Sequence, residues 1–225
     1  MTIIRLILIL IGVMRMKTNH DIRIDVNKLH PYLKYKLKLL LNACEKQNIY
    51  LIITEGFRTK EYQDELYAQG RTKPGIVVTN AKGSDYSSQH QWGVAFDIAI
   101  NDNKLLYDVN TLTKVSEIAK SKNIKLGWGG DWTNPVDRPH FYLTKWGSTP
   151  FRLKLLYRTF DNFKKTWTAK VRRKKGIAIW DKTHKKKKDT LVYATQVNVL
   201  WKHIRWAKVE YKDNAYGYVK SRFIK

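Results

Sequence analysis

One acidic residue, Asp97, interrupts the otherwise apolar run Val94–Ile100, and this run constrains the fold more than any other feature of the chain. Gly93 and the polar segment 101–103 bound the run, so its length and composition predict a short, largely buried strand. A carboxylate buried on such a strand needs a partner, because an unpaired charge is costly to take out of water. The sequence therefore predicts a strand that carries a metal ligand.

Two histidines lie in short motifs with acidic residues. His90 precedes Asp97 by seven residues, a spacing that does not match one helical turn, and Gly93 is expected to let the backbone turn tightly between them. His140 follows Asp137-Arg-Pro, where the proline disfavours helix at the residue before it and predicts a turn into a strand. A catalytic zinc ion usually has three protein ligands and an open fourth position, and His90, Asp97 and His140 would be those three ligands.

Asp137 is a second carboxylate in these two motifs. The predicted turn would put it near a zinc-bound water rather than on the zinc. Zinc lowers the pKa of water to about 7, and a positioned carboxylate can take the proton and return it to the leaving amine. The alternative for Asp137 is an ordinary loop acid, which is also our interpretation of Asp131. A lone histidine is more often structural than a ligand, and that class contains His20, His30, His184 and His203.

The pattern Ser-x-His-x-x-Gly-x-Ala-x-Asp at 88–97, followed by Asp-x-Pro-His at 137–140, resembles the zinc peptidases that include D-alanyl-D-alanine carboxypeptidases and dipeptidases. It is most similar to the L-alanyl-D-glutamate endopeptidases of bacteria and their phages, which are peptidoglycan hydrolases. The resemblance runs from about residue 25 to residue 149. Further blocks that fit this subgroup are Ile53–Thr59, Tyr67–Gly75, Val78–Lys82 and Gly127–Trp132.

The resemblance implies a Zn²⁺ site whose ligands are His90, Asp97 and His140. It implies that Asp137 is the catalytic acid and base. It places at Arg58 the arginine that in relatives binds substrate and stabilises the oxyanion, a role that a fixed guanidinium suits. The alternative for Arg58 is a surface salt bridge. Ser88 either orients His90 by a hydrogen bond or only shapes the turn.

The first part of the chain alternates predicted helices and strands. This alternation favours an α+β domain with a small antiparallel sheet. The single cysteine, Cys44, is expected to be buried in the first helix. The helices are predicted at Leu33–Gln47, Thr59–Gln69 and Leu112–Ser121, and the strands at Ile49–Thr54, Val94–Ile100 and Phe141–Leu143.

The composition changes toward the C-terminus. Residues 164–225 contain 19 Lys or Arg, 4 Asp or Glu and four of the eight tryptophans, so they carry +15 of the net charge of +24. Short β-rich runs alternate with turns and predict a small all-β barrel. These runs are Trp167–Val171, Gly176–Trp180, Leu191–Val197, Ile204–Tyr211 and Tyr216–Val219. The ending 206–224 resembles the last hairpin of bacterial SH3-like (SH3b) domains, which commonly bind cell wall; the alternative is a β domain that only adds solubility.

The predicted organisation is a signal or anchor segment at 1–20, a zinc peptidase domain at 21–150, a linker at 151–165 and an SH3b-like wall-binding domain at 166–225. The lysine-rich surface favours peptidoglycan and anionic wall polymers, including teichoic acids, as partners. Nucleic acid is not expected, because no base-stacking or groove-reading motif is present. The run 184–188, with four lysines, is expected to be a solvated loop.

The apolar run Ile3–Val13 is shorter than the roughly 20 residues of a membrane span. It could be the core of a signal peptide or a weak anchor, and membrane association is expected only through it. Met14–Lys17 offers no small-residue cleavage site, and translation from Met16 is the alternative. We expect a monomer that acts at the bacterial cell wall, either secreted or released as a phage lysin.

The leading hypothesis is a zinc endopeptidase that cuts the peptidoglycan stem peptide between L-alanine and D-glutamate. A D-alanyl-D-alanine carboxypeptidase would use the same metal site with another substrate pocket. A non-catalytic wall-binding protein with a structural zinc ion would need no base, yet Asp137 is present.

Overall fold

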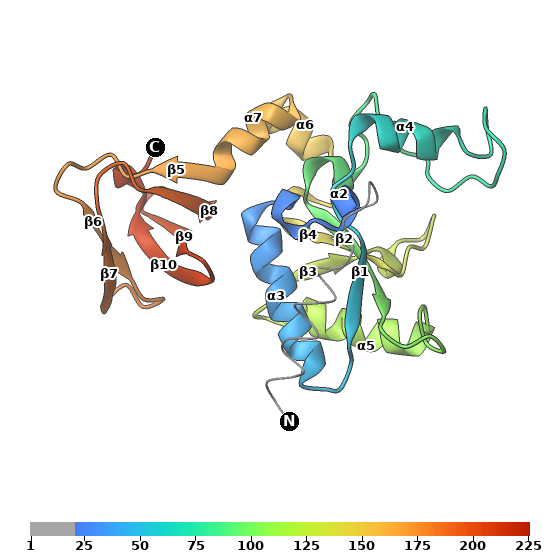
Figure 1. The fold of residues 1–225 in the computed structure, drawn as a ribbon, viewed down its shortest axis with the longest axis horizontal. Helices are drawn as coiled ribbons and strands as arrows, with labels where there is room; N and C mark the ends of the chain where they lie inside the picture. Colours follow the sequence, from blue (N-terminus) through green and yellow to red (C-terminus); the bar gives the residue numbers. More distant parts are fainter. Residues whose placement is uncertain (1–20) are drawn as a thin grey trace.

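The computed structural model describes residues 21–225, which form an α+β unit, a short helical segment and an all-β unit (Figure 1). The predicted signal or anchor segment and His20 lie outside the described residues. Within the described part of the chain, no helix is long and apolar enough to cross a membrane.

A four-stranded antiparallel sheet carries the first unit, with the strand order β1-β2-β4-β3. Its strands are β1 (Leu51–Glu55), β2 (Ala95–Ile100), β3 (Leu126–Trp128) and β4 (His140–Leu143). The central strands are β2 and β4, and their register pairs Asp97 with His140. Two strands that are distant in sequence therefore bring two predicted metal ligands side by side.

The helices of the first unit are α2 (Asp21–Ile24), α3 (Pro31–Glu45), α4 (Lys60–Ala68) and α5 (Val109–Lys120). α3 begins where Pro31 occupies the first turn and His30 is the N-cap, with its Nδ1 accepting a hydrogen bond from the Tyr32 backbone N–H at 3.0 Å. α3 and α5 bury apolar side chains in one core with β2 and β4, and Cys44 is buried there as predicted. The α+β prediction with a small antiparallel sheet is confirmed.

The segment predicted as a linker folds into α6 (Phe151–Tyr157) and α7 (Phe160–Lys164). Its Leu153 and Phe163 are fully buried in the core of the first unit. Trp167 joins the same core, and its ring lies 5.2 Å from the ring of His30. These residues fix the start of the C-terminal unit to the first one.

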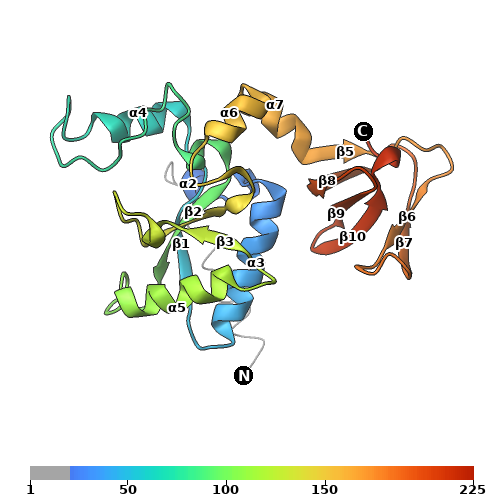
Figure 2. The same cartoon turned by 180° about the vertical axis from the view of Figure 1, so that it is seen from behind.

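The C-terminal unit is a six-stranded antiparallel sheet with the order β5-β8-β9-β10-β6-β7 and its own apolar core (Figure 2). The sheet is open in this order, so the predicted barrel is not established. The strands are β5 (Thr168–Lys170), β6 (Ile177–Trp180), β7 (Lys187–Leu191), β8 (Gln196–Lys202), β9 (Trp206–Lys212) and β10 (Ala215–Lys220).

Two predictions for this unit were wrong. The run Leu191–Val197 is not one strand: Leu191 ends β7, Gln196 begins β8, and Ala194 between them has φ of 64°. The lysine run was predicted to be a loop, but Lys187 and Lys188 begin the edge strand β7. Lysines are common on edge strands because their charge discourages pairing with another chain, so the β-rich composition alone misplaced this strand.

The two units also touch through α3 and the β9–β10 hairpin. Lys208 Nζ lies 3.7 Å from the centre of the Tyr35 ring, which in turn lies 4.8 Å from the ring of Tyr216. Lys38 Nζ donates a hydrogen bond to Asn214 Oδ1 at 2.8 Å. These three contacts are polar or aromatic, and each unit also has an apolar core of its own.

Candidate metal centre

A short 3-10 helix, η2 (Gln89–Trp92), positions His90 beside the sheet. Ser88 Oγ accepts a hydrogen bond from the His90 backbone N–H at 3.3 Å, so Ser88 shapes the turn rather than orienting the His90 ring. Gly93 ends η2 with φ of 62°, the left-handed conformation that glycine adopts without a steric cost. The predicted tight turn between His90 and the strand of Asp97 is therefore confirmed.

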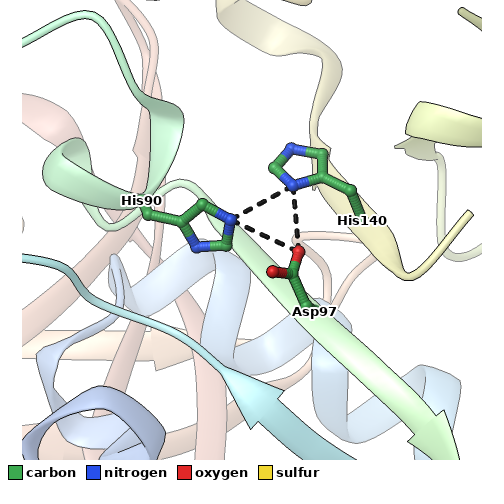
Figure 3. Close-up of side chains that lie close together, drawn as sticks. All are labelled: His90, Asp97 and His140. Carbon is green, nitrogen blue, oxygen red and sulfur yellow. Dashed lines mark hydrogen bonds and ion pairs between the residues drawn. The ribbon is translucent and has the colours of Figure 1, made fainter. Parts of the chain in front are cut away.

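The side chains of His90, Asp97 and His140 converge from η2, β2 and β4 (Figure 3). His90 Nε2 lies 3.2 Å from His140 Nδ1 and 3.3 Å from Asp97 Oδ1, and His140 Nδ1 lies 3.0 Å from the same oxygen. Both imidazoles are buried, with 3% and 4% of their residue surfaces exposed. The sequence therefore predicted correctly that these three residues lie together.

Each imidazole is oriented through the ring nitrogen that faces away from the cluster. His90 Nδ1 lies 2.7 Å from the carbonyl oxygen of Gly56, which can only accept, so Nδ1 carries the proton. His140 Nε2 lies 2.9 Å from Gln89 Oε1. The Gln89 amide nitrogen donates to the Gly147 carbonyl oxygen at 3.1 Å, so its oxygen must face His140.

When both rings are neutral, the three atoms that face one another, His90 Nε2, His140 Nδ1 and Asp97 Oδ1, therefore all carry free lone pairs. Burial and, after it, the charge of Arg58 together lower the pKa of His90 to about 4, so this ring is neutral near pH 7. Burial by itself would raise the pKa of Asp97, but the two imidazoles hold it well below its usual range. Two lone pairs and a carboxylate that face one another favour a bound cation.

The spacing of the three atoms also suits zinc. Tetrahedral zinc with bonds of 2.0–2.1 Å places neighbouring ligand atoms about 3.4 Å apart. The three separations of 3.0–3.3 Å in this cluster are close to that value. His90 Nε2, His140 Nδ1 and Asp97 Oδ1 could therefore hold one zinc ion on three corners of a tetrahedron, with the fourth corner left open.

Arg58 lies beside this cluster rather than on an exposed surface. Its NH2 donates to Asp97 Oδ2 at 3.4 Å, its NH1 donates to Gln63 Oε1 at 3.3 Å, and its Nε lies 3.7 Å from Glu55 Oε1. Glu55 also pairs with Arg23 at 3.5 Å. The guanidinium is thus held from several sides, and it orients the carboxylate oxygen that faces away from the imidazoles.

Asp137 lies in the turn before β4, as predicted, and its carbonyl oxygen accepts a hydrogen bond from the His140 backbone N–H at 3.3 Å. Burial raises the pKa of the Asp137 carboxyl, and the charge of Asp97 raises it further, against the opposing effects of His140 and Arg58. A carboxyl with a raised pKa holds a proton more readily than an ordinary carboxyl, which suits a group that accepts and returns a proton. Asp137 is not among the three residues whose ligand atoms cluster.

Sequence reasoning missed the residues that orient the site. Gln89 binds His140, and Gln63 and Glu55 hold Arg58. The adjacency of Gln89 to His90 was the only available signal. The ring of Trp132 lies 5.0 Å from that of His140 and forms one side of the site.

The remaining residues of the sequence analysis fall outside the site. His30 is buried among aromatic rings, and Asp131 Oδ1 pairs with Lys120 Nζ at 2.7 Å on the surface. His184 and His203 lie in the C-terminal unit.

A model of the VanY family, described as D-alanyl-D-alanine carboxypeptidase, matches residues 26–132. This range contains Arg58, His90 and Asp97 and ends before Asp137 and His140.

The curated proteins that are similar in sequence include two L-alanyl-D-glutamate peptidases. The chain is 40% identical over 123 residues to the peptidoglycan L-alanyl-D-glutamate endopeptidase CwlK of Bacillus subtilis (strain 168), and the match covers 50% of this chain and 71% of that protein. It is 31% identical over 120 residues to the L-alanyl-D-glutamate peptidase of Listeria phage A118, where the match covers 52% of this chain and 38% of that protein.

The solved structures that resemble part of the fold include two peptidases. The L-Ala D-Glu endopeptidase ChiX of Serratia marcescens is 21% identical with a TM-score of 0.40, over 53% of this chain and 84% of that one. The LD-carboxypeptidase LdcB is 21% identical with a TM-score of 0.39, over 54% and 70% of the two chains.

Proposed function

The chain belongs to the VanY family of peptidases, and we propose that it hydrolyses the stem peptide of peptidoglycan, between L-alanine and D-glutamate, with the help of Zn²⁺. The observation that carries the metal assignment is the convergence of three electron-pair donors, from His90, Asp97 and His140, within 3.0–3.3 Å of one another. We propose these residues as the zinc ligands.

A zinc ion held there supplies a Lewis acid, which lowers the pKa of water to about 7 and polarises the scissile carbonyl. Asp137 acts as the general base that accepts the proton of the attacking water and then as the acid that protonates the leaving amine. Its raised pKa suits both steps. Arg58 holds Asp97 and offsets the negative charge that develops on the carbonyl oxygen.

The names of two relatives support the choice of bond. The Bacillus protein is an L-alanyl-D-glutamate endopeptidase and the Listeria phage protein an L-alanyl-D-glutamate peptidase. The alternative is a D-alanyl-D-alanine carboxypeptidase, which is the description of the family model. The products distinguish the two activities, because the carboxypeptidase releases a single D-alanine and the endopeptidase separates the peptide from the glycan-linked L-alanine.

We further propose that the C-terminal unit is an SH3b-like domain that holds the enzyme on the cell wall. Its support is the net charge of +15 over residues 164–225, together with a six-stranded antiparallel sheet that has its own core. A basic surface attracts anionic wall polymers over about 10 Å at 0.1 M salt. The protein would therefore act at the bacterial cell wall, as a monomer.

The metal assignment is tested by comparing ligand variants with a base variant. The variants His90→Ala, Asp97→Ala and His140→Ala should each lose bound zinc and turnover of a soluble stem peptide. Asp137→Ala should keep zinc at the wild-type stoichiometry and lose about 10²-fold or more in rate, as expected for a general acid and base. Full activity of His90→Ala in metal-free buffer would refute the site, and loss of zinc from Asp137→Ala would make that residue a ligand.

A further inference from the structure

A cavity of about 570 Å³ lies in the C-terminal unit, far from the metal centre in sequence and in a separate sheet. The turn between β8 and β9 and the connection between β6 and β7 form it. We call it the hairpin cavity. Its lining residues are His184, Trp201, His203, Ile204, Arg205 and Trp206.

The aromatic wall of the hairpin cavity is built from fixed rings. The imidazole of His184 stacks on the indole of Trp206 with ring centroids 3.9 Å apart and planes at 8°. Lys220 Nζ lies 3.9 Å from the centre of the same indole. These contacts hold Trp206 in place through stacking and cation–π attraction.

Trp201 lines the cavity and has no aromatic ring stacked flat on it among the described residues. Among the described residues its aromatic neighbours are His203 and Tyr218, which meet it at 53° and 62°, so neither ring lies flat on the indole. The negative face of an indole attracts polarised C–H bonds. One face of a pyranose ring is rich in such bonds, and sugars therefore stack on tryptophan.

The polar groups that line the cavity are suited to a ligand that carries hydrogen-bond acceptors or a negative charge. No carboxylate lines the cavity, whereas Arg205 supplies a guanidinium at the rim. The nearby acid Asp181 is already engaged by hydrogen bonds from Thr183.

We propose that the hairpin cavity binds an acidic saccharide unit of the bacterial cell wall, with the sugar ring on Trp201 and the acidic group on Arg205. The identity of the polymer rests on the proposed function, whereas the chemistry of the ligand rests on the cavity. Ile204 at the tip of the turn, 97% exposed, adds an apolar edge against which a longer glycan can lie. The unit is then a lectin-like module as well as a basic surface.

The test uses the full-length protein and the indole N–H signals of its eight tryptophans in NMR spectra. The probes are N-acetylmuramic acid, N-acetylglucosamine as the same ring without the carboxylate, and inorganic phosphate as an anion alone. N-acetylmuramic acid should shift the signals of Trp201 and Trp206 with the highest affinity. Equal affinity for N-acetylglucosamine, or an equal response to phosphate, would overturn the proposal.

Variants separate the cavity from the general charge. Arg205→Gln, at an exposed position, should weaken N-acetylmuramic acid binding about tenfold, as loss of a charge-assisted hydrogen bond predicts. Trp201→Leu should abolish it, while Trp180→Leu, in the same sheet but outside the cavity, should leave it unchanged. Wild-type binding by both cavity variants would overturn the assignment.

Two further measurements assign the source and separate this inference from the proposed function. In an intact wall the lactyl carboxyl of muramic acid is bound as an amide to the stem peptide, so muramic acid is acidic only where the stem peptide has been removed. Walls freed of both stem peptides and secondary polymers should retain the protein if muramic acid is the ligand, and the extracted polymer should bind it if that polymer supplies the acidic sugar. Binding to neither contradicts the proposal. Cleavage of a soluble stem peptide, which needs no sugar contact, should be unchanged in Trp201→Leu. Cleavage without sugar binding would reject the saccharide site alone, and sugar binding without cleavage would reject the peptidase assignment alone.

Discussion

Replacing Gln89 by leucine removes the hydrogen-bond acceptor of His140 while leaving all proposed zinc ligands in place. Gln89 Oε1 lies 2.9 Å from His140 Nε2, and Gln89 is only 5% exposed. In the metal-free protein the freed imidazole can rotate to find another partner. A zinc ion bound to Nδ1 would fix the ring, and its Nε2–H would then face an apolar side chain. The free-energy cost of the unpaired Nε2–H is therefore larger in the zinc-bound protein than in the metal-free protein.

An unpaired buried N–H costs about 1–3 kcal/mol, and loss of such an orienting partner typically weakens metal binding by about 10- to 100-fold. We expect the zinc dissociation constant of Gln89→Leu to rise by that factor, which corresponds to about 1.4–2.7 kcal/mol. Competition with a chromophoric chelator measures it directly.

Gln91→Leu is the matched control. Gln91 belongs to the same 3-10 helix and is fully buried, but its amide donates to the Gly83 carbonyl oxygen at 2.8 Å and touches neither imidazole. This variant should lose stability in urea and keep its zinc affinity. A folded Gln89→Leu protein with wild-type zinc affinity would refute the role of Gln89, as would an equal loss of affinity in Gln91→Leu.

Two further variants test other parts of the structure. Arg58→Ala should lower kcat/KM by about 10²-fold, and Arg58→Lys should restore only part of this loss. A lysine ammonium cannot bind Asp97 and a developing oxyanion at the same time, as the planar guanidinium of arginine can. Unchanged kinetics in both variants would return Arg58 to a structural role. The second variant concerns His30, whose pKa burial lowers from 6.5 to about 3. Between these two pH values the unfolded chain binds a proton on His30 that the native protein does not bind. The free energy of unfolding therefore falls by up to about 1.4 kcal/mol for each unit by which the pH is lowered in this range. His30→Asn, which keeps an N-cap acceptor, should show a shallower loss of stability in urea titrations between pH 6 and pH 4, and identical slopes would contradict the assignment.

The three residues proposed as ligands could be picked out because their chemistry is local in the sequence. Asp97 is conspicuous on an apolar strand, and His90 and His140 lie in short motifs with acidic neighbours. The register that pairs Asp97 with His140 could not be read from the chain, because it depends on how β2 and β4 meet across about 40 residues of sequence. The family resemblance supplied the grouping of the three residues before the register was known.

The orienting residues and the C-terminal strands were harder to predict. Gln89 and Gln63 are neutral amides whose roles appear only when the chain brings His140 and Arg58 to them. In the C-terminal unit, strand β7 starts within a lysine run, so composition favoured a loop where edge pairing with β6 makes a strand. Leu153 and Phe163 were assigned to a linker. Their burial could not be foreseen, because it depends on the aromatic cluster around His30, which forms only in the folded chain.

The central claim is zinc-dependent cleavage of the stem peptide between L-alanine and D-glutamate. It is tested most directly by mass spectrometry of muropeptides after purified peptidoglycan is digested with metal-free protein, with and without one equivalent of zinc. The account predicts no cleavage without zinc and, with zinc, glycan fragments that end in L-alanine together with free peptides that begin with D-glutamate. Release of D-alanine alone would assign the carboxypeptidase activity instead. Cleavage that persists after removal of metal would contradict the account.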